Sequence, residues 1–178
     1  METTKWIFDP AHTSVEFEVR HLMISTVTGR FTEAECNLEA GDDFENAKFT
    51  FSANVNSIIT FDEKRDAHLK SADFFEADKY PKISFVSTSF KKTGDKQFEL
   101  AGDLTIRGTT KNVNLAVTHG GTVKDNFEKT KVGFEIIGKI KRSDFGLVWN
   151  ATIEAGGVLV SDEVKIIVNV EFKKLSES

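Results

Sequence analysis

EVKIIVNVEFK, the sequence of residues 163–173, is the stretch that decides the fold of this chain. Apolar side chains occupy every second position from Val164 to Phe172, and the positions between them are mostly polar. Successive side chains of a β-strand point to opposite faces of the sheet. This spacing therefore predicts a strand with one apolar face and one charged, solvated face.

The same period of two recurs along the whole chain, and many of its apolar positions are phenylalanine, which occurs 16 times in 178 residues. Alternation and turn residues together predict strands at about Trp6–Phe8, Val15–Arg20, Arg30–Glu39, Ala47–Asn56, Lys82–Lys91, Gln97–Ile106, Val113–His119, Lys131–Lys141, Val148–Ala155 and Glu163–Lys174. Turns are expected at Gly29, Gly41–Asp43, Thr93–Asp95, Gly120–Gly121, Arg142–Gly146 and Gly156–Gly157.

One stretch, Asp62–Lys79, lacks this period and predicts a helical insertion. Asp62 is the expected N-cap of the first helix, and Ser71 the expected cap of a second short helix at Ala72–Ala77. Antiparallel strands of about ten residues in meander order favour an up-and-down barrel over a sandwich. The sequence therefore predicts an all-β fold, a barrel of about eight strands with a short helical insertion, as a single domain over residues 1–178.

The composition excludes several classes of partner. A net charge of −5 with scattered lysines and arginines argues against a nucleic-acid partner and against a polybasic membrane-docking segment. No apolar run approaches the roughly 20 residues of a membrane-spanning helix. The N-terminus shows no secretory signal peptide. We therefore expect no integral membrane segment, and a soluble cytoplasmic protein, or a periplasmic one if a leader was removed.

The residues that could carry chemistry are few. The single cysteine, Cys36, is expected to be a small structural side chain. The four histidines are dispersed and show no zinc-site spacing, so we expect no metal and no cofactor. Arg65–His68 resembles an active site at first sight, but no serine or cysteine nucleophile stands at a recognisable spacing. An ion-paired helix that closes one end of the barrel is the preferred interpretation.

Several segments resemble a known family in order, spacing and identity. They are Trp6–Val15 (WIFDPAHTSV), Gly29–Phe31, Ile59–Asp62, Arg65–Phe75 (RDAHLKSADFF), Tyr80–Ile83, Gly102–Lys111 (GDLTIRGTTK) and Arg142–Gly146 (RSDFG). Together they resemble the YceI-like family of lipid- and polyisoprenoid-binding proteins, from about Trp6 to Lys173. The resemblance implies a lipocalin-like, extended antiparallel β-barrel that holds a long isoprenoid or fatty-acid-like chain in its lumen. It also implies a homodimer. Many members carry a periplasmic leader, which is not visible here.

The alternation predicts which side chains face the lumen and would contact a bound lipid. They are Phe17, Val19, Phe49, Phe51, Phe85, Leu115, Phe134, Ile136, Trp149, Ile166 and Val168. His12, Arg65, His68 and Arg107 are candidate polar contacts at the barrel mouth or on the helix.

Two questions stay open at the level of sequence. The same lumen side chains would serve equally as a filled barrel core, so the alternation does not decide whether the lumen is open. The preferred function is non-catalytic binding, transport or storage of a long apolar lipid such as a polyisoprenoid, a quinone or a fatty-acid-like chain. The alternatives are a small enzyme using His68 or His12 as acid or base on an amphipathic substrate, and a stress-related interaction protein with a filled barrel.

Overall fold

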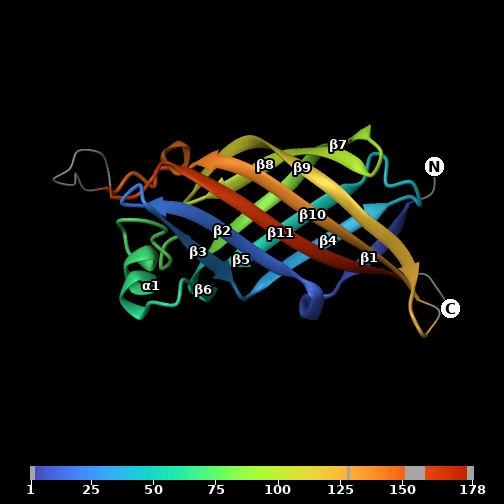
Figure 1. Cartoon of the computed structure of the whole chain (residues 1–178), viewed down its shortest axis with the longest axis horizontal. Coiled ribbons are helices and arrows are strands. Elements are labelled where there is room, and N and C mark those ends of the chain that lie inside the picture. The colour runs from blue at the N-terminus through green and yellow to red at the C-terminus, as the bar shows by residue number, and fades with distance from the viewer. Residues whose placement is uncertain (1–2, 128, 151–158, 176–178) are drawn as a thin grey trace.

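The computed structural model describes residues 3–127, 129–150 and 159–175 (Figure 1). The strands are β1 (Thr4–Phe8), β2 (Ser14–His21), β3 (Ser25–Phe31), β4 (Ala34–Ala40), β5 (Lys48–Asn54), β6 (Ile58–Ile59), β7 (Lys82–Gly94), β8 (Gln97–Ile106), β9 (Thr109–Lys124), β10 (Thr130–Lys141) and β11 (Glu163–Lys174). The helices are the α-helix α1 (Glu63–Lys70) and three 3₁₀ turns, η1 (Pro10–His12), η2 (Val55–Ser57) and η3 (Arg142–Phe145).

The strands close into an eight-strand antiparallel barrel, as predicted. The barrel closes because β1 and β2 pair with successive parts of β11, Phe8 with Phe172 and Ser14 with Asn169. β1 and β2 therefore act as one barrel strand that η1 interrupts. The Asp9 side chain caps η1 by accepting from the Ala11 N–H, and proline at the next position has no N–H to lose. This kink lets one strand wrap a long barrel.

A second barrel strand is broken in the same way. The predicted strand Arg30–Glu39 is wrong as a single element, because β3 ends at Phe31 and β4 begins at Ala34. Here the backbone bonds to the end of β5 and to the segment after it: the Asn54 N–H donates to the Glu33 carbonyl, and the Thr32 N–H donates to the Ser57 carbonyl. β3 pairs with β2, whereas β4 pairs with β1.

Two glycine sites predicted as turns lie inside strands. Gly29 is in β3 opposite Phe17, and a Cβ on it would lie 2.1 Å from the Phe17 Cζ. The glycine therefore makes room for an aromatic ring, and the β2–β3 turn falls instead at residues 22–24. Gly120–Gly121 lie within β9, where its register with β10 shifts between Gly133 and Phe134. A bulge, not a turn, is what these glycines supply.

The helical insertion is shorter than predicted. Asp62 caps α1 by accepting from the N–H groups of Lys64 and Arg65, as expected. The second helix predicted at Ala72–Ala77 is wrong, because this segment forms turns. Phe74 and Ala77 are buried there, so packing into the barrel end outweighs helix propensity. No helix among the described residues is long and apolar enough to cross a membrane.

The last predicted strand before β11 is also corrected. Val148–Asn150 have no regular secondary structure, and the rest of that prediction, 151–155, lies outside the described residues, as does the predicted turn Gly156–Gly157. The turn predicted at Arg142–Gly146 is present as η3, and Gly146 ends it in the left-handed conformation, with φ of 80°.

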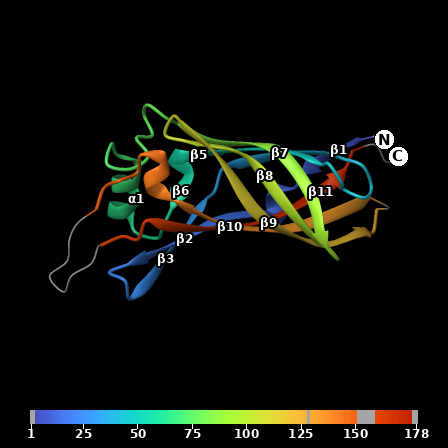
Figure 2. The same cartoon turned by 90° about the horizontal axis from the view of Figure 1, so that it is seen from above.

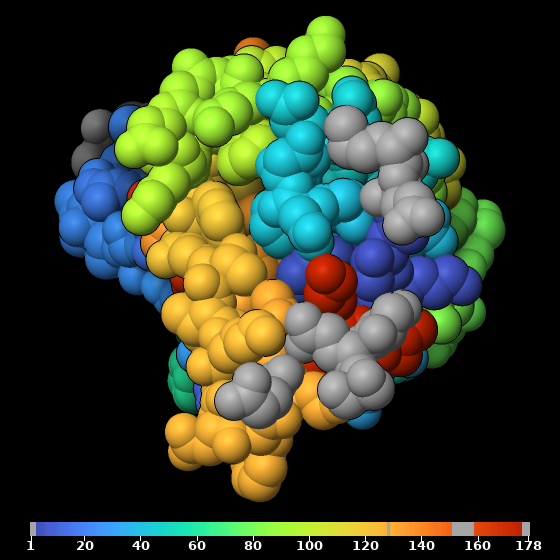
Figure 3. Space-filling model, turned by 90° about the vertical axis from the view of Figure 1, so that its right-hand side faces the viewer, coloured from blue at the N-terminus to red at the C-terminus, as the bar shows by residue number. Residues whose placement is uncertain are grey.

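One half of the barrel lumen is filled by aromatic rings. This half lies at the end that carries the two termini, where Figure 3 shows the β4–β5 loop (cyan) beside the β7–β8 (lime) and β9–β10 (gold) hairpins. The packed rings are Trp6, Phe44, Phe49, Phe90, Phe98, Phe134 and Phe172. Phe90 stacks on Phe98 at 4.5 Å between ring centroids, and Phe44 meets Phe134 edge-on at 5.3 Å.

Candidate functional site

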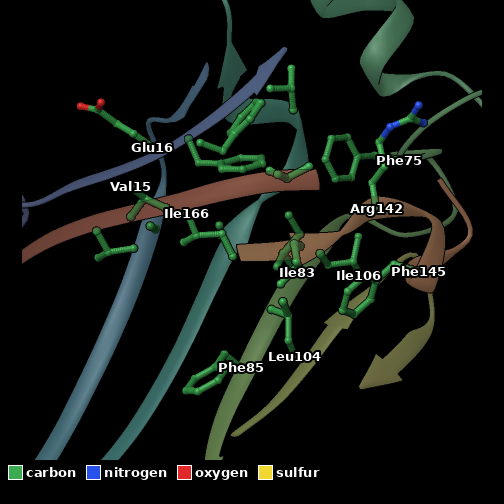
Figure 4. A pocket seen from close by; sticks show the side chains of 18 of the residues that line it. Val15, Glu16, Phe75, Ile83, Phe85, Leu104, Ile106, Arg142, Phe145 and Ile166 are labelled. Carbon is green, nitrogen blue, oxygen red and sulfur yellow. The ribbon is translucent and has the colours of Figure 1, made fainter. Parts of the chain in front are cut away.

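The other half of the lumen holds an apolar cavity of about 320 Å³. It lies at the end that carries α1, which Figure 2 shows opposite the termini. Its size falls at the lower edge of the roughly 300–1,000 Å³ that small-molecule sites occupy. Figure 4 shows side chains from several strands converging on it, among them Val15, Ile83, Leu104 and Ile166. The arrangement is a pocket suited to an apolar ligand.

Most of the predicted lumen residues lie on the wall of this cavity. They are Phe17, Val19, Phe49, Phe51, Phe85, Leu115, Ile136, Trp149, Ile166 and Val168. Phe134 is the exception, because it packs in the aromatic half against Phe44 and Phe49 and is not on the cavity wall. The alternation therefore identified the inner face of the barrel, but not the boundary between its filled and open halves.

Cys36 also lines the cavity, from β4. It lies opposite Phe51, which in turn lies opposite Phe85. Burial raises the pKa of the Cys36 thiol to about 12, so the group stays neutral and behaves as a small apolar side chain. This agrees with the structural role expected from the sequence.

The four candidate polar contacts separate into two pairs. Arg65 and His68, three residues apart on α1, both lie on the cavity wall. His12 and Arg107 do not. Exposed His12 bonds to Asp9 at 2.8 Å, and Arg107 donates to the Gly146 carbonyl at 3.1 Å and to Glu76 at 3.4 Å.

A hydrogen-bond network fixes the start of α1. Asp66 accepts from both the backbone N–H and the hydroxyl of Thr60. Arg65 donates from Nε to the Thr60 hydroxyl at 2.8 Å, and from Nη2 to the Thr60 carbonyl. Thr60 itself is buried, so its polar atoms need these partners. The network holds Arg65 at the edge of the cavity.

The neighbouring turn of the helix is held by aromatic contacts. The His68 ring lies edge-on to Trp149 at 4.7 Å and to Phe74 at 5.0 Å, and its Nε2 bonds to Asp73 at 2.8 Å. No serine or cysteine among the described residues bonds to the His68 imidazole, and the Ser71 hydroxyl donates to the backbone carbonyl of His68 instead. The imidazole is therefore positioned by packing, with one polar atom toward the solvent-exposed Asp73.

Sequence reasoning missed Arg142, the cationic group most deeply set in the cavity wall. Its side chain is buried and donates to four backbone carbonyls, those of Leu147, Trp149, Val160 and Ser161, at 2.7–3.2 Å. Burial lowers the pKa of its guanidinium, partly offset by the charge of Asp162. One signal was available: Arg142 continues the inward phase of β10, two residues after Ile140.

Asp9, His12 and Glu171 form a cluster of potential metal ligands outside the cavity. One donor atom of each lies within 4.8 Å of the others. The Lys131 ammonium lies 3.8 Å from the Glu171 carboxylate, and the Asp9 carboxylate already accepts from Ala11 and pairs with His12. Protein groups therefore already account for the charges in this cluster.

The chain matches the family model described as the YceI-like domain over residues 6–172. A UPF0312 protein of Staphylococcus aureus (strain MSSA476) is 37% identical over 171 residues, which cover 95% of this chain and 97% of the relative. A solved Campylobacter jejuni YCEI protein is 33% identical, with a TM-score of 0.76 over 89% of this chain and 90% of that one.

Two further solved structures share the fold at lower identity. Burkholderia cenocepacia BcnA has a TM-score of 0.81 at 22% identity, over 92% of this chain and 98% of its own. A polyisoprenoid binding domain from Saccharophagus degradans, implicated in plant cell wall breakdown, has a TM-score of 0.67 at 12% identity, over 98% and 100%. None of these names describes an enzymatic activity.

Proposed function

The chain belongs to the YceI-like domain family, and from this premise we propose that it binds one long apolar lipid in its lumen without catalysing a reaction. The observation that carries the proposal is the cavity of about 320 Å³, which is walled by aromatic and aliphatic side chains. The proposed ligand class is a polyisoprenoid, an isoprenoid quinone or a fatty-acid-like chain. The polyisoprenoid binding domain of Saccharophagus degradans, which shares the fold, supports this class.

Apolar burial alone is sufficient to drive such binding. Each buried methylene contributes about 0.8 kcal/mol, so ten buried carbons would contribute roughly 8 kcal/mol before the entropy of ordering is subtracted. A wall of this kind selects a ligand by its apolar surface and by the volume of the cavity. We propose carriage or storage of the lipid as the role.

The proposal is tested by asking what the purified protein holds. Organic extraction followed by mass spectrometry should recover a long apolar lipid at a molar ratio approaching one per chain. After delipidation, a fluorescent lipid should bind and be displaced by unlabelled chains. A protein that carries no lipid and binds no probe would contradict the proposal and would favour the filled-barrel interaction protein.

The alternative function to test is an enzyme that acts at the barrel mouth with His68 as a general acid or base. Substituting His68→Phe keeps an aromatic ring beside Trp149 and Phe74 and removes the titratable nitrogen. We expect lipid binding to persist in this variant. A turnover of candidate lipid esters by the wild-type protein that the variant loses would establish the enzyme instead.

We also propose the homodimer that the family resemblance implies. Sedimentation equilibrium should give twice the chain mass of 19.9 kDa. A mass of one chain across the micromolar range would exclude it.

A further inference from the structure

The charged side chains on the cavity wall lie in different places according to their sign. Glu16 lines the cavity through its stem, but Figure 4 shows its carboxylate pointing away, and it pairs with Arg30 at 2.8 Å. Glu35 is exposed and alternates with the inward Cys36. The positive and titratable nitrogen groups, in contrast, come from α1 and from η3 at one end of the cavity, where Arg65, His68 and Arg142 all lie on the wall.

Both arginines lack a carboxylate partner among the described residues. Arg142 donates only to backbone carbonyls, and no described carboxylate lies within 4.0 Å of either guanidinium. Asp162, whose charge acts on Arg142, bonds directly to Ser143 instead. A guanidinium removed from water is normally paired with an anion, because the unpaired charge is costly.

Each arginine also retains hydrogen-bond donors. A guanidinium has five N–H groups, and Arg142 uses four of them. Arg65 uses Nε and Nη2 on Thr60, and its Nη1 makes no hydrogen bond or ion pair with a described residue. One N–H of Arg142 and the Nη1 group of Arg65 therefore remain, and guanidinium N–H groups suit the oxygens of a carboxylate or phosphate.

The two arginines belong to one connected cluster. The Arg142 Cζ lies 5.9 Å from the centre of the Phe74 ring, and the same ring meets His68 at 5.0 Å. His68 is one helical turn after Arg65 on the cavity-facing side of α1. Figure 4 shows Arg142 beside Phe75, and both line the cavity together with Arg65 and His68, so the cluster adjoins the apolar wall.

We propose that the lumen ligand is an acidic amphiphile, a single apolar chain with a carboxylate or phosphate head, and that Arg65 and Arg142 hold this head. This inference rests on the proposed function, because the chain of the same molecule occupies the cavity. It narrows the ligand class: a neutral quinone or alcohol of equal chain length is a poorer ligand.

Matched pairs of ligands test the head independently of the chain. Delipidated protein is titrated at pH 8 with oleate against oleyl alcohol, and with farnesyl phosphate against farnesol, by displacement of the neutral dye Nile red. We expect each acid to bind at least about tenfold more tightly than its alcohol, which corresponds to about 1.4 kcal/mol. Inorganic phosphate tests whether a free anion binds at the same place, and at millimolar concentration it should displace no Nile red.

The variant Arg65→Gln should lower the preference for acid over alcohol to within about threefold, while oleyl alcohol binds as before. Arg142→Lys keeps a charge and is the milder companion to Arg142→Gln, whose four lost carbonyl contacts endanger folding. Arg30→Gln is the matched control, because Arg30 pairs with Glu16 outside the lumen. This control should keep the wild-type preference.

The outcomes separate this inference from the proposed function. Equal affinity of wild-type protein for acid and alcohol overturns the acidic head and leaves chain binding intact. Competition by inorganic phosphate alone assigns the arginines to a free anion and also overturns the lipid head. Failure of all four amphiphiles to bind overturns the proposed function itself, and the inference with it.

Discussion

Filling the cavity from within tests whether the lumen is the binding site. Ala53, on β5, is buried and lies on the cavity wall, outside the packed aromatic cluster. It has the same inward phase as Phe49 and Phe51 on that strand. The substitution Ala53→Phe therefore places a phenyl ring in the space that a ligand chain would occupy.

The size of the effect follows from the ring. A phenyl group takes the place of about six chain carbons, which at about 0.8 kcal/mol each is an upper bound of about 5 kcal/mol for a ligand that fills the cavity. This corresponds to a loss of affinity of up to about 4,000-fold. A ligand short enough to fit beside the ring should lose little. The ring itself enters existing space, so folding should cost no more than the roughly 1–3 kcal/mol typical of overpacking.

Calorimetric titration with saturated fatty acids of increasing chain length measures both effects. Wild-type affinity should rise about fourfold per methylene until the lumen is filled, and then level off. In Ala53→Phe the levelling should come about six carbons earlier. Thr50→Phe, on the exposed face of the same strand, is the matched control and should keep the wild-type profile. A folded Ala53→Phe protein with an unchanged profile would refute binding in the lumen.

Three further predictions follow from single contacts. Because burial raises the pKa of Cys36 to about 12, its alkylation by iodoacetamide at pH 8 should be about 1,000-fold slower than that of a cysteine of pKa 9.0, and bound lipid should slow it further. Gly29→Ala should lower the free energy of unfolding by about 1–3 kcal/mol in urea titrations, because its Cβ would overlap the Phe17 ring. Hydrogen bonds from Ser143 lower the pKa of the Asp162 carboxyl below its ordinary value of 3.8. The ionised Asp162 therefore contributes its full stabilisation above pH 3.8, and this stabilisation is lost as the pH falls through the lowered pKa. The variant Asp162→Asn should reduce the difference in melting temperature between pH 6 and pH 3. Equal labelling rates in free and lipid-bound protein, an unchanged unfolding midpoint for Gly29→Ala, or an unchanged pH difference for Asp162→Asn would contradict the respective prediction.

The barrel and most of its inner face could be predicted from the sequence because one physical rule governs both. A period of two assigns every strand residue to a face, and closure of the barrel makes one face the lumen. Phe17, Phe51 and Ile166 were placed on the cavity wall in this way, without any knowledge of their neighbours. The rule gives no information on how far the opposite side of the barrel lies from each residue. It therefore could not show that Phe134 packs in the filled half of the lumen, whereas the other three line the cavity.

The error at Gly29 and the omission of Arg142 as a site residue have a shared cause. A glycine in a strand pattern suggests a turn, yet Gly29 is required by the ring of Phe17, a residue twelve positions away that only strand pairing brings opposite. Arg142 lies in a local turn signal, yet its burial depends on the carbonyls of Val160 and Ser161, nearly twenty residues later. Local sequence patterns predict strands and turns, whereas the roles of Gly29 and Arg142 depend on partners that are distant in the sequence.

The division of the lumen into two halves suggests how a ligand would lie in it. Phe44 comes from the β4–β5 loop and packs against Trp6 and Phe134, so part of the block at the terminal end is a ring that no strand alternation would have placed there. An apolar tail that lies against this packed aromatic layer is removed from water together with the surface that it covers. The head of the same molecule then falls at the opposite end, beside Arg65 and Arg142, whose guanidinium groups have no carboxylate partner among the described residues. The packed half and the charged cluster thus favour the same orientation, tail toward the termini and head toward α1.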